Sequence, residues 1–301
     1  MKPNVTTYVD PHQKEAALDV IHNRSIELGS QVIQVPPLSS HNWSVPGPPT
    51  PGLQGEVQTH NASLAVALAS HFLHVHNNPD HLHCPPVVHQ PGQLLPELSP
   101  LHLSQSVSRG LEKTRWPGRN QVVRRRGVEY YLDGAHTEES MLVCADWFRN
   151  ACIVEDKVKV FRVLLFNTTG DRDVRTLLDP LTKLDLDLVI FCTNLSRHKD
   201  SVDQQNFTTN EQMQLDKCDL HLSSWSELQS DLPDRTPVPG VVIPCINDAL
   251  LWATAGRDTD LPPPYQITHH PTPPSLIQSD MVQLLVTGSL HLVGGVVGCI
   301  R

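Results

Sequence analysis

Three side chains whose types suit a phosphorylated ligand lie close together in the sequence. Arg119 stands in a turn of sequence Trp-Pro-Gly-Arg, and Asp133 and His136 stand where an expected strand ends and an expected helix begins. A guanidinium is a planar, permanent cation that suits phosphate oxygens, and a carboxylate accepts hydrogen bonds from sugar hydroxyls. Ligands of open α/β sheets bind at this end of the strands. An exposed arginine in a tight turn and a helix-capping aspartate explain the same residues, so the local pattern leaves both interpretations open.

The elements around these residues alternate between strand and helix patterns. The expected strands are 128–132, 158–166, 188–191 and 283–287, and the expected helices are 137–151, 174–184 and 246–255. Two of the strands, 158–166 and 188–191, are near-continuous apolar runs, as buried parallel strands are. Alternation of this kind predicts an α/β fold with a doubly wound, mostly parallel sheet.

The first hundred residues have a different character. They contain helical spacing at 15–28 and 61–75, a short strand at 32–35, a Pro-rich loop at 36–51 and a Pro- and His-rich stretch at 79–100. We interpret this last stretch as an insertion or linker. A boundary near 104–110 then predicts two parts, residues 1–105 and residues 106–301.

Composition excludes some classes of function. Acidic residues outnumber basic ones, 32 to 23, so a general nucleic-acid-binding surface is not expected. The dense basic run 124–126 fits a solvated strand edge, although a polyanionic substrate could use it. The apolar run 282–299 is interrupted by polar residues and glycines, which predicts strand, turn and helix and not a membrane span. The first residues lack the apolar core of a signal peptide, so we expect an intracellular, soluble protein.

A histidine-rich run could in principle bind zinc, because imidazole and thiolate are zinc ligands. Its members are His71, His74, His76, His81, His83 and Cys84. Their spacing matches no compact zinc site, so we predict no metal site from this run.

Five segments, in the same order along the chain, resemble the folylpolyglutamate synthases, which are Mur-type ATP-dependent amide ligases. They are 55–62 (Gly-Glu-Val-Gln-Thr-His-Asn-Ala), 111–141 (with Trp-Pro-Gly-Arg and Leu-Asp-Gly-Ala-His), 163–173 (Val-Leu-Leu-Phe-Asn-Thr-Thr-Gly-Asp-Arg-Asp), 204–207 (Gln-Gln-Asn-Phe) and 285–295 (Leu-Val-Thr-Gly-Ser-Leu-His-Leu-Val-Gly-Gly). The resemblance implies a Mur-ligase-type C-terminal domain, preceded by a partial remnant of the central α/β ATP-binding domain.

The same resemblance implies a function. The family joins glutamate to the γ-carboxyl of a reduced folate: ATP, with Mg²⁺, phosphorylates that carboxylate, and the glutamate amine then attacks the acyl phosphate. The expected partners are therefore ATP, a reduced folate and L-glutamate, and the expected compartments are the cytoplasm, the mitochondrion or both. We expect a monomer, although the apolar face of a partial domain could promote association.

Roles follow for individual residues. The resemblance implies that Arg119 contacts the ATP phosphates, that Asp133 binds the ribose and that Asn61 lies against the adenine. A helix N-cap is the simpler alternative for Asn61. The family commonly has histidine at the position of Val57, which removes one expected polar contact.

Three further residues are candidates with structural alternatives. His136 follows the Asp-Gly-Ala turn and is the candidate catalytic residue, close to the acyl phosphate or the incoming glutamate, because helix N-termini favour anions. A capping or packing role is the alternative. Ser289 and His291 are candidate glutamate contacts, against the alternative of tight strand-to-helix packing.

One expected motif is absent from the sequence. An ATP ligase of this type uses a phosphate loop ending in Gly-Lys-Ser/Thr, and no Gly-Lys pair occurs here. The resemblance implies that the loop and the Mg²⁺ ligands lie upstream of Met1, in an N-terminal portion that this chain lacks. We therefore expect little ligase activity from the chain alone. The alternative is a non-catalytic fragment that binds a nucleotide or partner and modulates the full enzyme.

Overall fold

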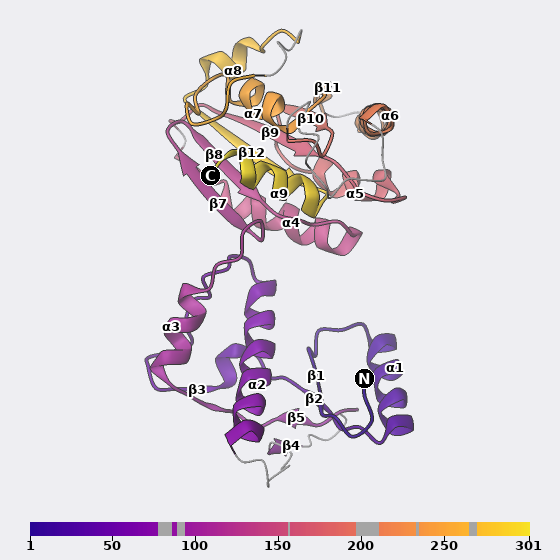
Figure 1. Ribbon diagram of the computed structural model, residues 1–301, viewed down its shortest axis with the longest axis vertical. Coiled ribbons are helices and arrows are strands. Elements are labelled where there is room, and N and C mark those ends of the chain that lie inside the picture. Colours follow the sequence, from indigo (N-terminus) through magenta and orange to yellow (C-terminus); the bar gives the residue numbers. More distant parts are fainter. Residues whose placement is uncertain (78–85, 89–93, 156, 197–210, 233–234, 265–269) are drawn as a thin grey trace. The chain divides into compact units, whose positions relative to one another are not determined.

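The computed structural model describes residues 1–77, 86–88, 94–155, 157–196, 211–232, 235–264 and 270–301 (Figure 1). The chain forms two compact units, residues 1–115 and residues 116–301. Each unit has its own sheet and its own buried clusters, so each is described by itself.

The second unit is built on a six-stranded sheet. Its strands are β7 (Gln121–Arg125), β8 (Val128–Leu132), β9 (Val160–Phe166), β10 (Leu188–Cys192), β11 (Gly240–Ile243) and β12 (Met281–Thr287). They lie in the order β11-β10-β9-β12-β8-β7, and every neighbouring pair is parallel except β7 with β8. The predicted mostly parallel sheet is therefore confirmed, with one antiparallel strand at its edge.

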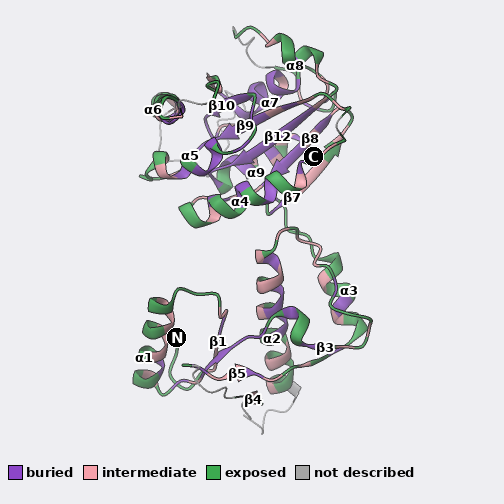
Figure 2. Cartoon of the chain, turned by 180° about the vertical axis from the view of Figure 1, so that it is seen from behind, coloured by how far each residue is buried: buried purple, intermediate pink, exposed green. Residues whose placement is uncertain are grey.

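Helices cover both faces of this sheet. The helices are α4 (Glu138–Ala151), α5 (Val174–Thr182), α6 (Glu211–Ser230), α7 (Ile246–Thr254), α8 (Pro274–Gln278) and α9 (Leu290–Cys299). One buried cluster joins α4, α5 and α6 to one face, and a second joins α7, α8 and α9 to the other. Successive strand residues point to opposite faces, so Tyr130 belongs to one cluster and Tyr131 to the other. Figure 2 shows the buried strands between exposed helix surfaces.

The predicted elements of this unit agree closely with the observed ones. The expected helices at 137–151, 174–184 and 246–255 correspond to α4, α5 and α7, and the apolar run 282–299 forms strand β12, a turn and α9. The basic run 124–126 lies on edge strand β7 and the turn after it, which confirms a strand edge. The sequence interpretation missed β11, the long helix α6 and the short helix α8.

The first unit has much shorter strands. Its elements are β1 (Thr7–Val9), α1 (Glu15–Leu28), β2 (Val32–Gln34), the 3-10 helix η1 (Leu38–Ser40), β3 (Asn42–Trp43), α2 (Val57–Asn77), β4 (Val87–Val88), β5 (Glu97–Leu98), β6 (His102–Leu103) and α3 (Gln105–Lys113). The order β1-β2-β5-β4 forms one sheet, and β3 pairs with β6. The expected loop 36–51 thus contains η1 and β3. The stretch 79–100, interpreted as an insertion or linker, contains β4 and β5, and β5 lies next to β2.

Helix α2 differs from its prediction in two ways. It begins at Val57, so Asn61 lies in its second turn and the N-cap alternative for that residue is wrong. The expected broad apolar face is only partly buried: Ala62 and Ala67 are buried, whereas Phe72 is 66% exposed.

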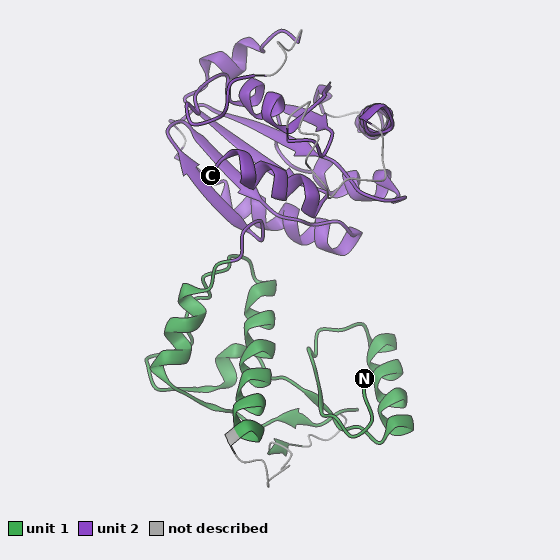
Figure 3. Ribbon diagram, viewed as in Figure 1, with its two compact units in different colours: residues 1–115 green, residues 116–301 purple. Residues whose placement is uncertain are grey.

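The division between the units falls after Arg115, whereas the predicted boundary fell after residue 105 (Figure 3). The intervening helix α3 belongs to the first unit because Val107 and Leu111 pack against a cluster that includes Leu38 and Val66. An amphipathic helix cannot end a domain without its apolar side being covered. Among the described residues, no helix is both long and apolar enough to cross a membrane.

Candidate functional site

The carboxyl ends of parallel strands β8, β9 and β12 lie along one edge of the six-stranded sheet. Backbone hydrogen bonds join the turns at this edge. The Gly134 amide donates to the Gly118 carbonyl at 3.1 Å, and the Asp133 amide donates to the Val286 carbonyl at 3.1 Å. The turn 116–120 is thereby attached to the end of β8. We call the residues 116–120, 133–136 and 287–291 the strand-end edge.

Asp133 anchors this edge through its carboxylate. One oxygen accepts a hydrogen bond from the Asn120 amide at 2.9 Å, and the other accepts one from the Ala135 amide at 2.9 Å. Burial raises the pKa of Asp133, and these hydrogen bonds and the charge of Arg119 oppose that rise. The carboxylate therefore holds two turns together while staying next to a cation.

Arg119 is exposed and lies beside that carboxylate. Its backbone amide donates to the Trp116 carbonyl at 3.2 Å, which closes the turn. Its guanidinium makes no hydrogen bond or ion pair with any residue that the structure describes, although its charge acts on Asp133. Gly118 has a φ of +74°, and a Cβ there would lie 2.4 Å from a methyl of Val293. Glycine is therefore required for this turn to pack against α9.

His136 lies one residue before the N-cap of α4. Its Nδ1 is 2.9 Å from the Gly134 carbonyl, and its amide donates to the Ser140 hydroxyl at 3.0 Å. Thr137 and Ser140 form a capping box at the start of α4. The ring is half-buried and close enough for its charge to act on Asp133. A capping or packing role of His136 accounts for these contacts. They leave Nε2 of its ring for a ligand.

Ser289 and His291 follow β12 on the same edge. The buried Ser289 hydroxyl caps α9 by accepting from the His291 amide at 3.1 Å. Gly288 has a φ of +101°, and a Cβ there would lie 2.4 Å from the Asn167 carbonyl. The expected tight strand-to-helix packing is thus present, and the exposed His291 ring is the side chain that can reach a ligand.

Sequence reasoning missed a group of buried polar residues at the same edge. Asn167 donates to the Cys192 carbonyl, and the Thr168 hydroxyl is 3.2 Å from Nε2 of His221. Asn194 follows β10 and its amide donates to Gln214. The signal was available, since polar pairs follow the apolar runs of β9 and β10 directly in the sequence.

Comparisons with known proteins show which proteins this chain is similar to. No protein-family model matches the chain. Mitochondrial folylpolyglutamate synthase of Bos taurus is 37% identical over an alignment of 327 residues. The alignment covers 94% of this chain and 55% of that protein. The Homo sapiens protein of the same name is 37% identical over an alignment of 325 residues, and this alignment covers 94% of this chain and 54% of that protein. The chain is a homologue of the folylpolyglutamate synthases. It spans about half the length of the curated relatives it matches.

Solved structures agree on the fold of these homologues. A Mycobacterium tuberculosis folylpolyglutamate synthase complexed with ADP and AMPPCP superposes with a TM-score of 0.56 at 16% identity, covering 96% of this chain and 54% of that chain. A bifunctional folylpolyglutamate synthase/dihydrofolate synthase from Yersinia pestis, complexed with AMPPNP and a Mn ion, gives 0.53 at 13% identity, covering 99% of this chain and 53% of that one. At such identities the likeness supports the fold alone.

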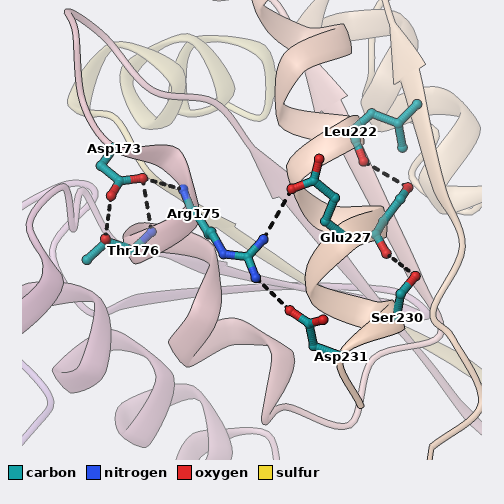
Figure 4. Close-up of polar contacts among 8 residues, drawn as sticks. Asp173, Arg175, Thr176, Leu222, Glu227, Ser230 and Asp231 are labelled. Carbon is teal, nitrogen blue, oxygen red and sulfur yellow. Dashed lines mark hydrogen bonds and ion pairs between the residues drawn. The ribbon is translucent and has the colours of Figure 1, made fainter. Parts of the chain in front are cut away.

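Asn61 and Asp173 lie on other elements, helix α2 and the start of helix α5. Asn61 belongs to the first unit, where it is exposed and donates to Gln58 at 3.1 Å. Asp173, in the family-like segment 163–173, caps α5 by accepting from Arg175 and Thr176, as a natural cap does (Figure 4). The segment 204–207 lies outside the described residues.

The histidine-rich run is only partly described. His71, His74 and His76 lie on α2, where Nδ1 of His71 is 2.6 Å from the Tyr8 hydroxyl. His81, His83 and Cys84 lie outside the described residues. Among the described residues, one group of His, Cys, Asp or Glu side chains has metal-binding spacing, and it consists of Asp10, His12 and His60. None of these three residues belongs to the histidine-rich run.

Proposed function

We propose that this chain is a nucleotide-binding portion of a folylpolyglutamate-synthase-type ligase. Such a ligase uses ATP to add glutamate to the γ-carboxyl of a reduced folate. The observation that carries the proposal is the pairing of Asp133 with the Arg119 turn, in a chain homologous to this family over 94% of its length. Asp133 binds the ribose and Arg119 the phosphates.

The chemistry of the two groups supports these roles. An ionised carboxylate has about four lone-pair sites, and the two backbone amides on Asp133 leave sites for ribose hydroxyls. The guanidinium of Arg119 makes no hydrogen bond or ion pair with a described residue, so it can approach phosphate oxygens as a planar fork. ADP, AMPPCP, AMPPNP and Mn in the related structures support ATP together with a divalent cation, Mg²⁺ in this proposal.

The other candidates complete the proposal. Asn61 contacts the adenine, since its amide lies on an exposed face of α2. The exposed ring of His291, whose backbone amide donates to the capping hydroxyl of Ser289, contacts the incoming glutamate together with Ser289. His136 is the catalytic candidate because it stands at the N-terminus of α4, where an acyl phosphate would be stabilised. The names of the relatives support a mitochondrial location, and we propose a cytoplasmic form as well.

The chain alone should turn over slowly. Phosphoryl transfer needs charge neutralisation around the γ-phosphate, and this sequence contains no Gly-Lys pair from which a phosphate loop could be built. Arg119 alone leaves most of the developing charge uncompensated. We propose that the chain binds nucleotide as a monomer and depends on a phosphate loop outside these 301 residues for ligation.

Isothermal titration of the chain with AMPPNP tests nucleotide binding at the strand-end edge. Charge-assisted hydrogen bonds contribute roughly 1.5–3 kcal/mol, so Arg119→Ala and Asp133→Ala should each weaken binding at least about tenfold. Arg126→Ala is the matched control, because Arg126 is exposed at the β7–β8 turn, at the other end of strand β8. Equal affinities of the Arg119→Ala and Arg126→Ala variants would refute the proposed contact.

A second measurement separates binding from catalysis. Phosphate release is followed with ATP, tetrahydrofolate and glutamate all present. We expect none above background from the chain alone. Release that depends on both folate and glutamate would contradict the expected dependence on a further phosphate loop. Nucleotide binding without release in any combination with a loop-containing N-terminal portion would favour the non-catalytic alternative.

A further inference from the structure

Three potential metal ligands meet in the first unit. Asp10 and His12 follow strand β1, and His60 lies in the first turn of α2. One ligand atom from each residue lies within 4.8 Å of the others. Residues fifty positions apart in sequence thus converge at the carboxyl end of the short parallel sheet, the end where α/β sheets bind ligands.

The three side chains are held in fixed relative positions. One Asp10 oxygen is 2.7 Å from Nδ1 of His12 and accepts from the His12 amide at 3.0 Å. The other Asp10 oxygen is 3.8 Å from Nδ1 of His60. The two imidazoles are stacked, with centroids 4.0 Å apart and planes 2° from parallel. The two stacked imidazoles and the carboxylate thus place three ligand atoms within 4.8 Å of one another.

These separations suit a tetrahedral ion. Zinc binds imidazole nitrogen and carboxylate oxygen at about 2.0–2.2 Å, which puts neighbouring ligand atoms about 3.4 Å apart. The observed oxygen-to-nitrogen distances of 2.7 and 3.8 Å bracket that value, so small rotations of the two rings complete the geometry. Coordination would then replace the hydrogen bond between Asp10 and His12.

The surroundings offer room and support. A hollow of about 10 Å³ borders the three residues and is lined also by Pro36 and Ser63, which is about the space that one water molecule occupies. The Ser63 hydroxyl donates to the Pro36 carbonyl at 2.6 Å and fixes the wall of the hollow.

We propose that Asp10, His12 and His60 bind one divalent transition-metal ion of the zinc type, with a water molecule as fourth ligand. Imidazole ligands select zinc, cobalt, nickel or copper over magnesium, which prefers oxygen. This ion is therefore distinct from the divalent cation of the nucleotide. It joins the end of β1 to the start of α2 and stabilises the first unit.

The test titrates the purified chain with Co²⁺, whose visible absorption distinguishes tetrahedral from octahedral coordination, and then displaces it with Zn²⁺. We expect one equivalent of tetrahedral Co²⁺ that zinc displaces and excess Mg²⁺ does not. His60→Gln, His12→Gln and Asp10→Asn should each weaken binding at least about tenfold, because losing even an outer-shell partner of a metal ligand costs roughly 10–100-fold in affinity. His102→Ala is the control, because it removes an exposed histidine of strand β6 in the same unit.

The outcomes are decisive in both directions. Circular dichroism first establishes that each variant is folded, and Asp10→Asn keeps the size of its side chain. Binding that is lost in the three ligand variants and kept in His102→Ala supports the site. Absence of tetrahedral Co²⁺ in the unsubstituted chain, or equal binding by all four variants, would overturn it.

Discussion

The two units differ in how completely their sheets are covered. In the second unit, strands of four to seven residues are packed on both faces by helices. In the first unit, the four strands of the main sheet have only two or three residues each. Its helix α2 leaves Leu68, Phe72 and Leu73 at least half exposed. The second unit therefore holds a self-sufficient core, and the first does not reach the same degree of burial.

This difference affects the two candidate sites. The strand-end edge follows strands β8, β9 and β12, whose residues are mostly buried, so its turns are positioned by a rigid support. The Asp10, His12 and His60 group stands on a unit with few buried apolar contacts, where local opening costs less free energy. A metal ion would add stability where the core is smallest.

The largest expected effect comes from removing a core aromatic of the second unit. Phe191 on β10 is fully buried and packs edge-on against Phe166, so Phe191→Ala should lower the free energy of unfolding of that unit by about 3–5 kcal/mol. Hydrogen exchange read by peptide mass spectrometry should show lost protection in peptides of residues 116–301 only. Equal loss in peptides of residues 1–115 would mean that the units unfold together, and the comparison would fail.

The same contrast explains what the sequence could predict. Long apolar runs such as that of β9 identify themselves, because a buried parallel strand needs apolar residues on both faces. The strands β4 and β5 have two residues each, too few for any periodicity, and only their partners in the sheet define them. Helix α6 was missed because its buried face includes Gln214 and His221, polar residues that find partners only in the folded chain.

The candidate sites follow the same rule. Arg119 and Asp133 were found from local turn and strand-end patterns, since both the hydrogen bond to Asn120 and the glycine turn are local features. The group around His60 could not be found, because its members become neighbours only when β1 and α2 pack in one unit. Nothing in the spacing of residues 10, 12 and 60 indicates it.

Acidification should destabilise the second unit next most strongly. Burial, with the nearby charge of Lys217, lowers the pKa of His221 from its ordinary 6.5 to about 4. The unfolded chain therefore binds a proton that the folded chain excludes, so stability is full above about pH 6.5 and falls as the pH drops toward 4. The contribution is roughly 3 kcal/mol. In the first unit, burial also lowers the pKa of His41, which gives a loss of the same sign.

Urea unfolding at several pH values measures this dependence. His221→Gln keeps a hydrogen-bonding group near Thr168 but removes the titrating ring, so the slope of stability against pH in the second unit should become shallower. His102→Ala, an exposed histidine substitution, should leave the slope unchanged. An unaltered slope in His221→Gln would show that this ring is not buried in its neutral form.

Two changes in helix capping should have smaller effects on stability, a loss in the second unit and a gain in the first. At α4 the Thr137 hydroxyl accepts from the Ser140 amide at 3.2 Å, and the Ser140 hydroxyl accepts from the Thr137 amide at 2.9 Å. Thr137→Ala should cost about 1 kcal/mol in the second unit. At α1 the N-cap is Lys14, with no side-chain hydrogen bond to the helix start, so Lys14→Ser should stabilise the first unit by up to about 1 kcal/mol. Hydrogen exchange at the two helix N-termini would detect either change, and a stabilised α4 with a weakened α1 would reverse the comparison.

The smallest effect is expected for the ion pairs between α5 and α6. The Arg175 guanidinium is 3.2 Å from Glu227 and 2.6 Å from Asp231 (Figure 4). All three side chains are largely exposed, so solvent and salt screen the attraction. Arg175→Ala should lower the unfolding free energy of the second unit by less than about 1 kcal/mol, and by less still at high salt. The matched control is Arg149→Ala, because Arg149 pairs with Asp146 within one helix and joins no second element. If Arg175→Ala cost as much as Phe191→Ala, surface charge and not the buried sheet would be holding this unit together, because the helices would then depend on the ion pairs for their attachment.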